Sequence, residues 1–463
     1  MRETKRRVEN FLFYDAAGVE RHLAKMAERG WGLEKITPFF WYYRRMEPKK
    51  RTYTVTYFPD ASDFDPAPTD GQQTFRAYCQ ASGWEFVVQW AQMQIFCTER
   101  EHPVPIETEE SVRLQTTHHA MKKNYLPGSI AMAALALFQI GTQISLGNYD
   151  LVGKLADGTQ PYILLLFLLL LLNSILMLGG YASWYRKSKR RVEQGGACAE
   201  CGGWYRKWAN ALYLPVGLLA IGWLWEVSRQ GNLRMLWPVL VLFVLLFLGV
   251  YTVRWGLKKA RVSRNLNRGL TMAACVVLTL GMMAGLMLVA LQGIRHNWFE
   301  AEPVEQYETI NGGQSMLWDI YHDPLPLRVE DLAEVDYPHY TYQWEEESSF
   351  LVSRSAGDQH AFPDGEDVPD LSYEIVDVKA GFLYDLCLRQ YMEKDRDWEP
   401  ELHFPAVDAA LWQADAVYQE YVGTEPRNRF VVCWGRRIVE IVFPYDWALT
   451  PAQIAIAAEK LRG

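Results

Sequence analysis

The sequence predicts a multi-domain integral membrane protein in which two α+β domains flank a bundle of five transmembrane helices. Residues 162–181 are almost unbroken hydrocarbon, and about 20 such residues in a helix span a bilayer core of roughly 30 Å. Four similar apolar segments lie between residues 126 and 294. The net charge is +1 over residues 1–123, +11 over residues 124–294 and −20 over residues 295–463. A basic centre beside an acidic domain is typical of a transmembrane topology.

Residues 1–123 predict a ferredoxin-like α+β sandwich. Asp15 is placed to cap the N-terminus of a helix in which Val19, Leu23 and Met26 share one face. The expected elements are a strand over 8–14, a helix ending near Gly30, strands over 39–45 and 51–58, a helix over 72–82, and strands over 85–90 and 93–98. This β-α-β-β-α-β-β order is the observation that predicts the ferredoxin-like arrangement.

Spaced aromatic and glycine positions recur through this region, at residues 11–14, 26–33, 53–60, 78–84 and 94–97. The pattern resembles the uncharacterised family called Domain of Unknown Function 2812 (DUF2812). The resemblance implies a bacterial protein that is often membrane-attached and frequently encoded beside PadR-type transcriptional regulators. A PadR-type regulator system is therefore a candidate partner. The family has no agreed catalytic residues, so the resemblance implies a fold unit and no chemistry.

Five membrane-spanning helices are predicted, at about residues 126–146, 162–183, 209–228, 235–254 and 270–293. Their orientation follows from lysine and arginine, which collect in cytoplasmic loops. The loop over 184–208 holds seven of these residues and the loop around 254–269 holds six, whereas the loop over 147–161 holds one. Both basic loops are expected in the cytoplasm with residues 1–123, and the first span is expected to act as an internal signal-anchor. An odd number of spans then puts residues 295–463 on the extracytoplasmic side of the cell membrane.

The spans contain little that indicates transport of ions. Glu226 and Arg234 fall at interfaces rather than at mid-span, so a pump or ion-coupled transporter has little support. Gly281 and Gly285 in the last span fit the small-xxx-small contact pattern. Two interpretations of this pair stay open: packing among the helices of one chain, or the seam of a homodimer.

Four cysteines are candidates for chemistry. Cys198 and Cys201 in the first basic loop resemble half of a zinc knuckle, and a tetrahedral site would need a second pair, for example from another copy. Reduced bystander thiols and a redox sensor are the alternatives. Cys387 and Cys433 are expected outside the cytoplasm, where disulfides persist. The pair is either a disulfide or two buried thiols. The adjacent residues His118 and His119 are expected in a solvated linker.

Residues 295–463 predict a second α+β domain, large enough to hold its own core. The expected elements are strands over 338–345, 349–355 and 371–379, a helix over 381–392, and strands over 429–434 and 437–443. A final helix has Thr450 as its N-cap, Pro451 at its first position and Gln453 completing a capping box. A carboxylate-rich loop could hold calcium, although its spacing departs from the EF-hand pattern and a solvated loop is preferred. Its members are Asp358, Asp364, Glu366, Asp367 and Asp370.

No catalytic or cofactor signature can be placed in this sequence. The leading hypothesis is a non-enzymatic sensor or regulator that couples the extracytoplasmic domain to a protein partner at the cytoplasmic domain. A transporter, or an accessory subunit of one, is the second hypothesis, supported by four polar residues within spans: Gln139, Thr142, Gln143 and Asn173. The third is an extracytoplasmic enzyme that uses paired carboxylates. Nucleic-acid binding is not expected, because the acidic domain would repel phosphate.

Overall fold

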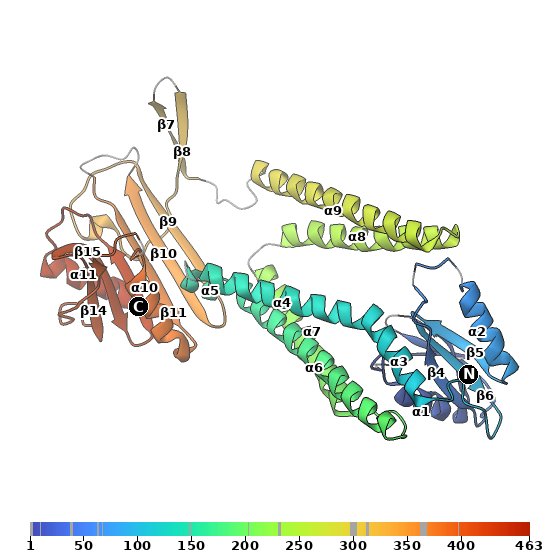
Figure 1. Cartoon of the computed structure of the whole chain (residues 1–463). Coiled ribbons are helices and arrows are strands. Elements are labelled where there is room, and N and C mark those ends of the chain that lie inside the picture. The colour runs from blue at the N-terminus through green and yellow to red at the C-terminus, as the bar shows by residue number, and fades with distance from the viewer. Residues whose placement is uncertain are drawn as a thin grey trace. The chain divides into compact units, whose positions relative to one another are not determined.

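The computed structural model describes residues 3–9, 11–37, 40–62, 64–66, 68–147, 150–201, 203–229, 233–296, 303–311, 314–361, 368–396 and 398–463. These residues form two compact units (Figure 1). The N-terminal unit comprises Met1–Gln139, Leu166–Ile221 and Asn232–Val289. The C-terminal unit comprises Ile140–Leu165, Gly222–Gly231 and Ala290–Gly463. Each unit therefore combines one sheet-containing domain with parts of the long helices.

The N-terminal domain consists of two antiparallel three-stranded sheets and the helices around them. Its elements are β1 (Thr4–Arg7), α1 (Ala16–Glu28), β2 (Trp31–Ile36), β3 (Trp41–Arg45), β4 (Thr52–Tyr57), α2 (Asp70–Ala81), β5 (Glu85–Trp90) and β6 (Met93–Thr98). One sheet has the order β1-β3-β2 and the other has the order β4-β6-β5. These two sheets do not confirm the ferredoxin-like arrangement, which stays a prediction.

The predicted strand over residues 8–14 is wrong. The first strand is β1, which ends at Arg7, and the chain then turns, with the Asp15 amide donating to the Leu12 carbonyl at 2.9 Å. This turn brings Asp15 to the start of α1, where its carboxylate accepts a hydrogen bond from the Gly18 amide at 3.1 Å, as the capping prediction required. The sequence reasoning also missed β2, which begins immediately after Gly30 reverses the chain with a φ of 77°.

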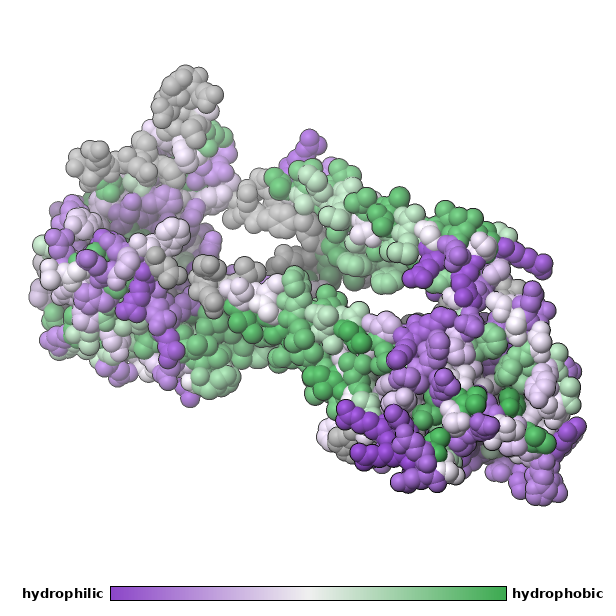
Figure 2. Space-filling view, viewed as in Figure 1, coloured by the Kyte–Doolittle hydropathy of each residue, from purple (hydrophilic) through white to green (hydrophobic). Residues whose placement is uncertain are grey.

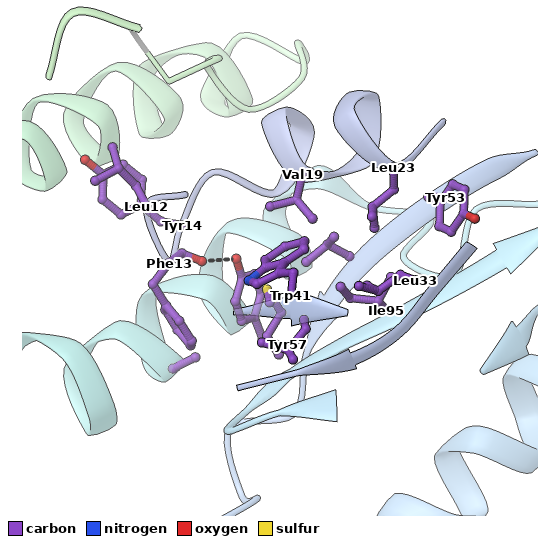
Figure 3. Packing of buried hydrophobic residues seen from close by; sticks show 14 of the residues in the cluster. Leu12, Phe13, Tyr14, Val19, Leu23, Leu33, Trp41, Tyr53, Tyr57 and Ile95 are labelled. Atoms are coloured by element: carbon purple, nitrogen blue, oxygen red, sulfur yellow. Dashed lines mark hydrogen bonds between the residues drawn. The ribbon is translucent and has the colours of Figure 1, made fainter. Parts of the chain in front are cut away.

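The core of the N-terminal domain lies between α1 and the sheets (Figure 3). Val19 and Leu23 point from α1 toward Trp41 and Tyr57, and all four side chains are buried. The Tyr57 hydroxyl donates a hydrogen bond to the Phe13 carbonyl oxygen, so the buried polar tip of this aromatic side chain has a partner. The predicted face of the first helix is therefore confirmed as the core face.

Within the part of the chain that the structure describes, five helices are long and apolar enough to cross a membrane, as predicted. They are α4 (Leu126–Gly147), α6 (Gln160–Glu193), α7 (Gly203–Arg229), α8 (Leu233–Lys259) and α9 (Arg264–Arg295). Figure 2 shows hydrophobic residues gathered on these helices, whereas the two sheet-containing domains are mostly polar on the face in view. The chain is thus a multi-pass membrane protein by the length and composition of its helices.

Two of these helices are longer than the predicted spans. Helix α6 continues ten residues past 183, through a segment predicted as a basic loop. Helix α4 is preceded without a break by α3 (Glu110–Ala120) and by the π-helical turn η1 (Met121–Tyr125). Both extensions reach the N-terminal domain, where Leu114, Met121 and Trp184 are buried.

Helices α8 and α9 lie side by side (Figure 1). A Cβ atom on Gly249 would lie 2.8 Å from Leu278, and one on Gly285 would lie 3.3 Å from Leu242. A Cβ atom on Gly281 would meet nothing within 4 Å among the described atoms. Of the predicted pair of packing glycines, Gly285 thus faces α8 within the chain and Gly281 faces open space, so a homodimer seam stays a prediction.

The C-terminal domain is built on one antiparallel sheet. Its strands are β9 (Tyr340–Ser348), β10 (Val352–Ala361), β11 (Leu371–Val378), β12 (Leu402–His403), β13 (Ala406–Val407), β14 (Ala416–Val422), β15 (Glu425–Trp434) and β16 (Arg437–Val442). Their order is β12-β14-β15-β16-β11-β10-β9, with β13 also paired to β14. The strands predicted over 371–379 and 437–443 are confirmed, and the structure pairs them with each other at the centre of this sheet. A separate hairpin, β7 (Glu305–Asn311) and β8 (Gln314–Ile320), was not predicted.

Helices cover both faces of this sheet. Helix α11 (Pro451–Arg462) buries Ala457, Ala458 and Leu461 on one face, and its predicted cap is confirmed because Thr450 and Gln453 form a capping box. Helix α10 (Tyr384–Glu393) packs on the other face beside α5 (Leu151–Ala156), a short helix in the connection between α4 and α6. That connection was predicted as a plain loop, and it instead belongs to the core of the C-terminal domain.

Candidate functional site

Aromatic side chains join the N-terminal domain to α6. Tyr14 packs against Tyr181 and Trp184, with ring centroids 5.3 and 5.1 Å apart. The Trp184 indole donates a hydrogen bond to the Ala199 carbonyl at 2.8 Å, so the segment after α6 also folds onto the domain. His118 of α3 lies 2.5 Å from the Tyr181 hydroxyl through its Nδ1, and therefore the prediction of a solvated linker is wrong for His118. We call this contact region the N-terminal junction.

A partly buried ion pair also joins α3 to α1. Arg113 of α3 contacts the Glu20 carboxylate of α1 at 3.0 Å, and the same carboxylate accepts a hydrogen bond from the Val55 amide at 2.9 Å. Burial raises the pKa of Glu20, and Arg113 opposes that rise. Glu107 accepts a hydrogen bond from the Thr56 hydroxyl at 2.8 Å, and burial raises the pKa of Glu107 as well. These contacts hold α3 to α1 and β4 by charge as well as by packing.

The two cysteines of the predicted half zinc site are part of the N-terminal junction. The Cys198 amide donates to the Glu110 carboxylate at 2.9 Å, and the Cys201 thiol contacts the Tyr14 carbonyl at 3.9 Å. Burial, together with the neighbouring Glu110, raises the pKa of the Cys198 thiol to about 12. The half zinc site at Cys198 and Cys201 stays a prediction. Among the described residues, no group of three or more His, Cys, Asp or Glu side chains could hold a metal ion.

A second contact ties the N-terminal domain to α9. Arg264, at the first position of this helix, forms two hydrogen bonds to the Asp65 carboxylate, at 2.7 and 2.8 Å. Asn267, one turn later, donates to the Phe64 carbonyl at 3.0 Å. A bidentate arginine–carboxylate pair fixes direction as well as distance. The domain is therefore anchored at helices from both the early and the late part of the membrane region.

The C-terminal domain meets the helices through α5 and the turn between β9 and β10. The Val152 amide of α5 donates to the Gln390 side chain at 2.7 Å, and Val152 itself is buried in the domain core. Ser349 of the turn donates to the Leu155 carbonyl. Arg229, the last residue of α7, donates to the Ser348 carbonyl at 2.8 Å and to the buried Glu226 carboxylate. We call this contact region the C-terminal junction.

A groove of about 880 Å³ lies at the C-terminal junction. Its apolar lining comes from Ile144, Leu164 and Leu165 of the membrane helices and from exposed Phe382 and Trp398 of the domain. Its charged lining consists of Lys154, Arg389, Glu393, Lys394 and Asp395. A large apolar groove with a few polar groups is the usual form of a binding site for a small or amphipathic molecule. Sequence reasoning missed this site because its two walls are far apart in the chain.

A second pocket, of about 530 Å³, has carboxylates that are already neutralised. Arg429 contacts Glu420 at 2.8 Å and Glu440 at 2.5 Å, and Lys394 contacts the other Glu440 oxygen at 2.9 Å. An acid–base pair of carboxylates needs one member to hold or accept a proton. Paired in this way with arginine and lysine, Glu420 and Glu440 are arranged as an ion network that fastens β14, β15 and β16.

The residues predicted for a disulfide, for transport and for calcium binding lie at different places in the structure. Cys387 and Cys433 are free, buried thiols. Of the four polar residues that supported a transporter, Gln143 lines the groove, where it bonds to Gln160 at 2.7 Å, and the other three are not among its lining residues. In the carboxylate-rich segment, Asp358 bonds to His360 at 2.6 Å. Its members Asp364, Glu366 and Asp367 lie outside the described residues.

Comparison with known proteins identifies one region. Residues 15–127 match the family described as protein of unknown function (DUF2812), which confirms the resemblance seen in the sequence. The match runs from the cap of α1 to the second residue of α4, and so it includes the α3 side of the N-terminal junction but not Tyr181 and Trp184 of α6. No curated protein and no solved structure matches the chain.

Proposed function

We propose that this chain is a non-enzymatic sensor or regulator in the cell membrane, with the C-terminal domain as receiver and the N-terminal domain as responder. The observation that carries the proposal is that α4 and α6 each contribute to both compact units. Helix α6 places Tyr181 and Trp184 in the core of the N-terminal unit, and its first residues line the groove of the C-terminal unit. A change at one end of such a helix has a physical route to the other end.

The length and stiffness of these helices support this role. Helix α6 has 34 residues, so it measures about 50 Å at 1.5 Å per residue. Helices α3, η1 and α4 follow one another without a break. Side-chain networks and rigid helices transmit a change only where an element has two arrangements, and the partly polar C-terminal junction is the place where we expect the second arrangement to form.

The proposed orientation puts the N-terminal domain in the cytoplasm and the C-terminal domain on the extracytoplasmic side. Support comes from the lysines and arginines that gather at the ends of α6 and α8 and at the starts of α7 and α9. Reporter fusions at residues 1 and 463 test it directly. Signals on opposite sides of the membrane are expected, and both ends on one side would remove the receiver–responder relation. The cytoplasmic partner is expected to be a protein, with a PadR-type regulator system as the candidate that the family resemblance implies.

Coupling itself is tested by hydrogen exchange of the full chain in lipid nanodiscs. Arg229→Ala removes the side chain that joins α7 to Ser348 at the C-terminal junction. We expect faster exchange in α1 and in residues 181–193 of the N-terminal junction. Arg462→Ala is the control, because Arg462 is exposed and lies at the end of α11. If Arg229→Ala changes exchange only in the C-terminal unit, the two domains are not coupled and the proposed function is wrong.

A further inference from the structure

An unpartnered ammonium group, that of Lys154, is buried at the wall of the groove at the C-terminal junction. Lys154 is on α5, and its Nζ atom is buried without a hydrogen-bond partner in the described part of the chain. A buried charge without a partner is costly, and buried charges in proteins are normally paired. Lys154 lines the groove, so an anionic group entering the groove would supply the missing partner.

Because two of the other charged side chains of the groove are already paired, the remaining ones give it a net positive charge that would attract such an anion. Lys394 is held by Glu440 at 2.9 Å, and Asp395 is held by Arg429 at 3.0 Å. The charged lining residues that remain are Lys154, Arg389 and Glu393, two cations against one anion. The domain as a whole is acidic, since residues 295–463 carry −20. Attraction of an anion must therefore come from this local site and not from the general field of the domain.

The apolar wall indicates that the anion carries a hydrocarbon chain. Ile144, Leu164 and Leu165 belong to α4 and α6, which are long and apolar enough to span the membrane. Opposite them, Phe382 is 83% exposed and Trp398 is 91% exposed. Tryptophan at such a position favours the boundary between lipid and water. An acyl chain could lie along the helices while its head group reaches Lys154, whereas a small soluble anion would leave this wall uncovered.

We propose that the groove binds one anionic phospholipid, with its phosphate paired to Lys154 and an acyl chain against α4 and α6. The inference deepens the proposed function and rests on it, because it names the ligand class of the receiver. Arg389, on the exposed side of α10, is the second cation that lines the groove. Lipid bound here would touch α4, α5, α6 and α10 at once and would fix the C-terminal junction in one arrangement.

Native mass spectrometry of the full chain in detergent, titrated with phosphatidylglycerol, tests the site. We expect one tightly held lipid on the wild type, about tenfold weaker binding by Lys154→Gln, and retained binding by Lys154→Arg. The matched control is Lys460→Gln, which removes a lysine paired with Asp331 elsewhere in the domain. Equal binding by wild type and Lys154→Gln would mean annular lipid only and would overturn the proposal. Equal affinity for phosphatidylcholine, or competition by inorganic phosphate, would overturn it as well.

Thermal unfolding provides a second readout that a purely structural role would not give. Without added lipid, Lys154→Gln is expected to be at least as stable as the wild type, because it removes an unpaired buried charge. With phosphatidylglycerol, the wild type is expected to gain stability and the variant is not. A variant that is less stable without lipid and gains as much from it would contradict the site. Lipid binding without any change in exchange at the N-terminal junction would contradict the proposed function and leave the site standing.

Discussion

The two junctions between domains and membrane helices are built differently. At the N-terminal junction, rings from α3 and α6 form part of the hydrophobic core of the domain, and α3 continues through η1 into α4. At the C-terminal junction, the short helix α5 buries the side chains of Val152 and Ala156, Phe350 packs against Tyr162, and Ser349 and Arg229 add polar contacts. Aromatic core packing is stiff because truncation is costly, whereas the polar contacts of a half-exposed side chain such as Arg229 are individually weak.

This difference shows which end of the membrane region has freedom to change. A responder must follow its helices closely, and a domain that shares its core with them does so. A receiver must be able to shift when a ligand binds, and local stability is low where contacts are few and exposed. The four predictions below compare the two junctions through matched substitutions, from the largest expected effect to the smallest.

Truncation of one aromatic side chain at each junction should give the largest difference in the free energy of unfolding. Trp184 is 8% exposed and Phe350, in the turn between β9 and β10, is 49% exposed. We expect Trp184→Ala to lower the free energy of unfolding of the N-terminal unit by about 3–5 kcal/mol, and Phe350→Ala to cost about 1 kcal/mol in the C-terminal unit. Chemical unfolding in detergent, with limited proteolysis to distinguish the units, measures both. Equal costs would mean that the junctions are equally rigid.

Matched arginine substitutions come next. Arg113 has a side chain 27% exposed beside Glu20, and Arg229 has one 50% exposed beside Glu226. Arg113→Met leaves the partly buried Glu20 carboxylate unpaired and should cost about 2 kcal/mol. Arg229 is half exposed, so water can replace it beside the buried Glu226 carboxylate, and Arg229→Met should cost about 1 kcal/mol. Double-mutant cycles with Glu20→Gln and Glu226→Gln isolate each pair. A larger coupling energy at Arg229 would reverse our ordering of the junctions.

The pH dependence should differ in the same direction. Burial raises the pKa of both Glu107 and Glu347, and Arg354 opposes the rise at Glu347. An acid with a raised folded-state pKa binds its proton more tightly when folded. Its stabilising contribution is therefore complete below the ordinary pKa of 4.5 and is lost as pH rises through the folded-state pKa. Glu107→Gln should raise the unfolding temperature by a few degrees at pH 8 and hardly at all at pH 4, and Glu347→Gln should have a smaller effect.

A variant effect that is the same at both pH values would show that the Glu107 side chain acts through shape and not through charge. Glu101→Gln is a suitable control, because Glu101 is exposed in the same domain.

Thiol reactivity should show the smallest effect. Burial raises the pKa of Cys198 to about 12 and the pKa of Cys387 to about 11. At pH 8 both are neutral thiols, so iodoacetamide should label them slowly until the chain is unfolded. Mass spectrometry of non-reduced samples checks this at both junctions. A bonded Cys387–Cys433 pair, or a zinc-dependent rise in unfolding temperature that requires Cys198 and Cys201, would contradict these expectations.

Local signals account for what the sequence predicted correctly. Five spans follow from hydrophobic length, the final helix follows from Thr450 and Gln453 at its cap, and the central strands follow from their apolar runs. The contacts that make the junctions are long-range and have no such signal. Lysines and arginines over 186–191 indicated a loop, yet Trp184 and Ser188 are buried on one face of a helix that continues to Glu193. The buried residues Tyr181, Trp184 and Ser188 are spaced by three and then four positions, which is the periodicity of one helix face. This spacing is the signal in the sequence that could have revealed the longer helix.

The groove could not be predicted for a related reason. Lys154 reads as an ordinary loop residue until α5 is placed against α10, more than two hundred positions farther along the chain. Similarly, the start of the chain resembled a strand over 8–14 because its aromatic residues are apolar, whereas those residues are buried by a turn that brings Asp15 to α1. Apolar character indicated burial in both places but did not specify the partner.

The single wide turn η1 has a geometric consequence for the whole first span. One extra residue in a turn advances the angular position of everything after it by about 100°. It allows α3 to direct Leu114 into a protein core, where Met121 of η1 is also buried, while α4 directs Leu135 and Phe138 outward. Removal of one residue between Met121 and Tyr125 would therefore rotate α4 by about 100° relative to the N-terminal domain and shorten the helix by only about 1.5 Å.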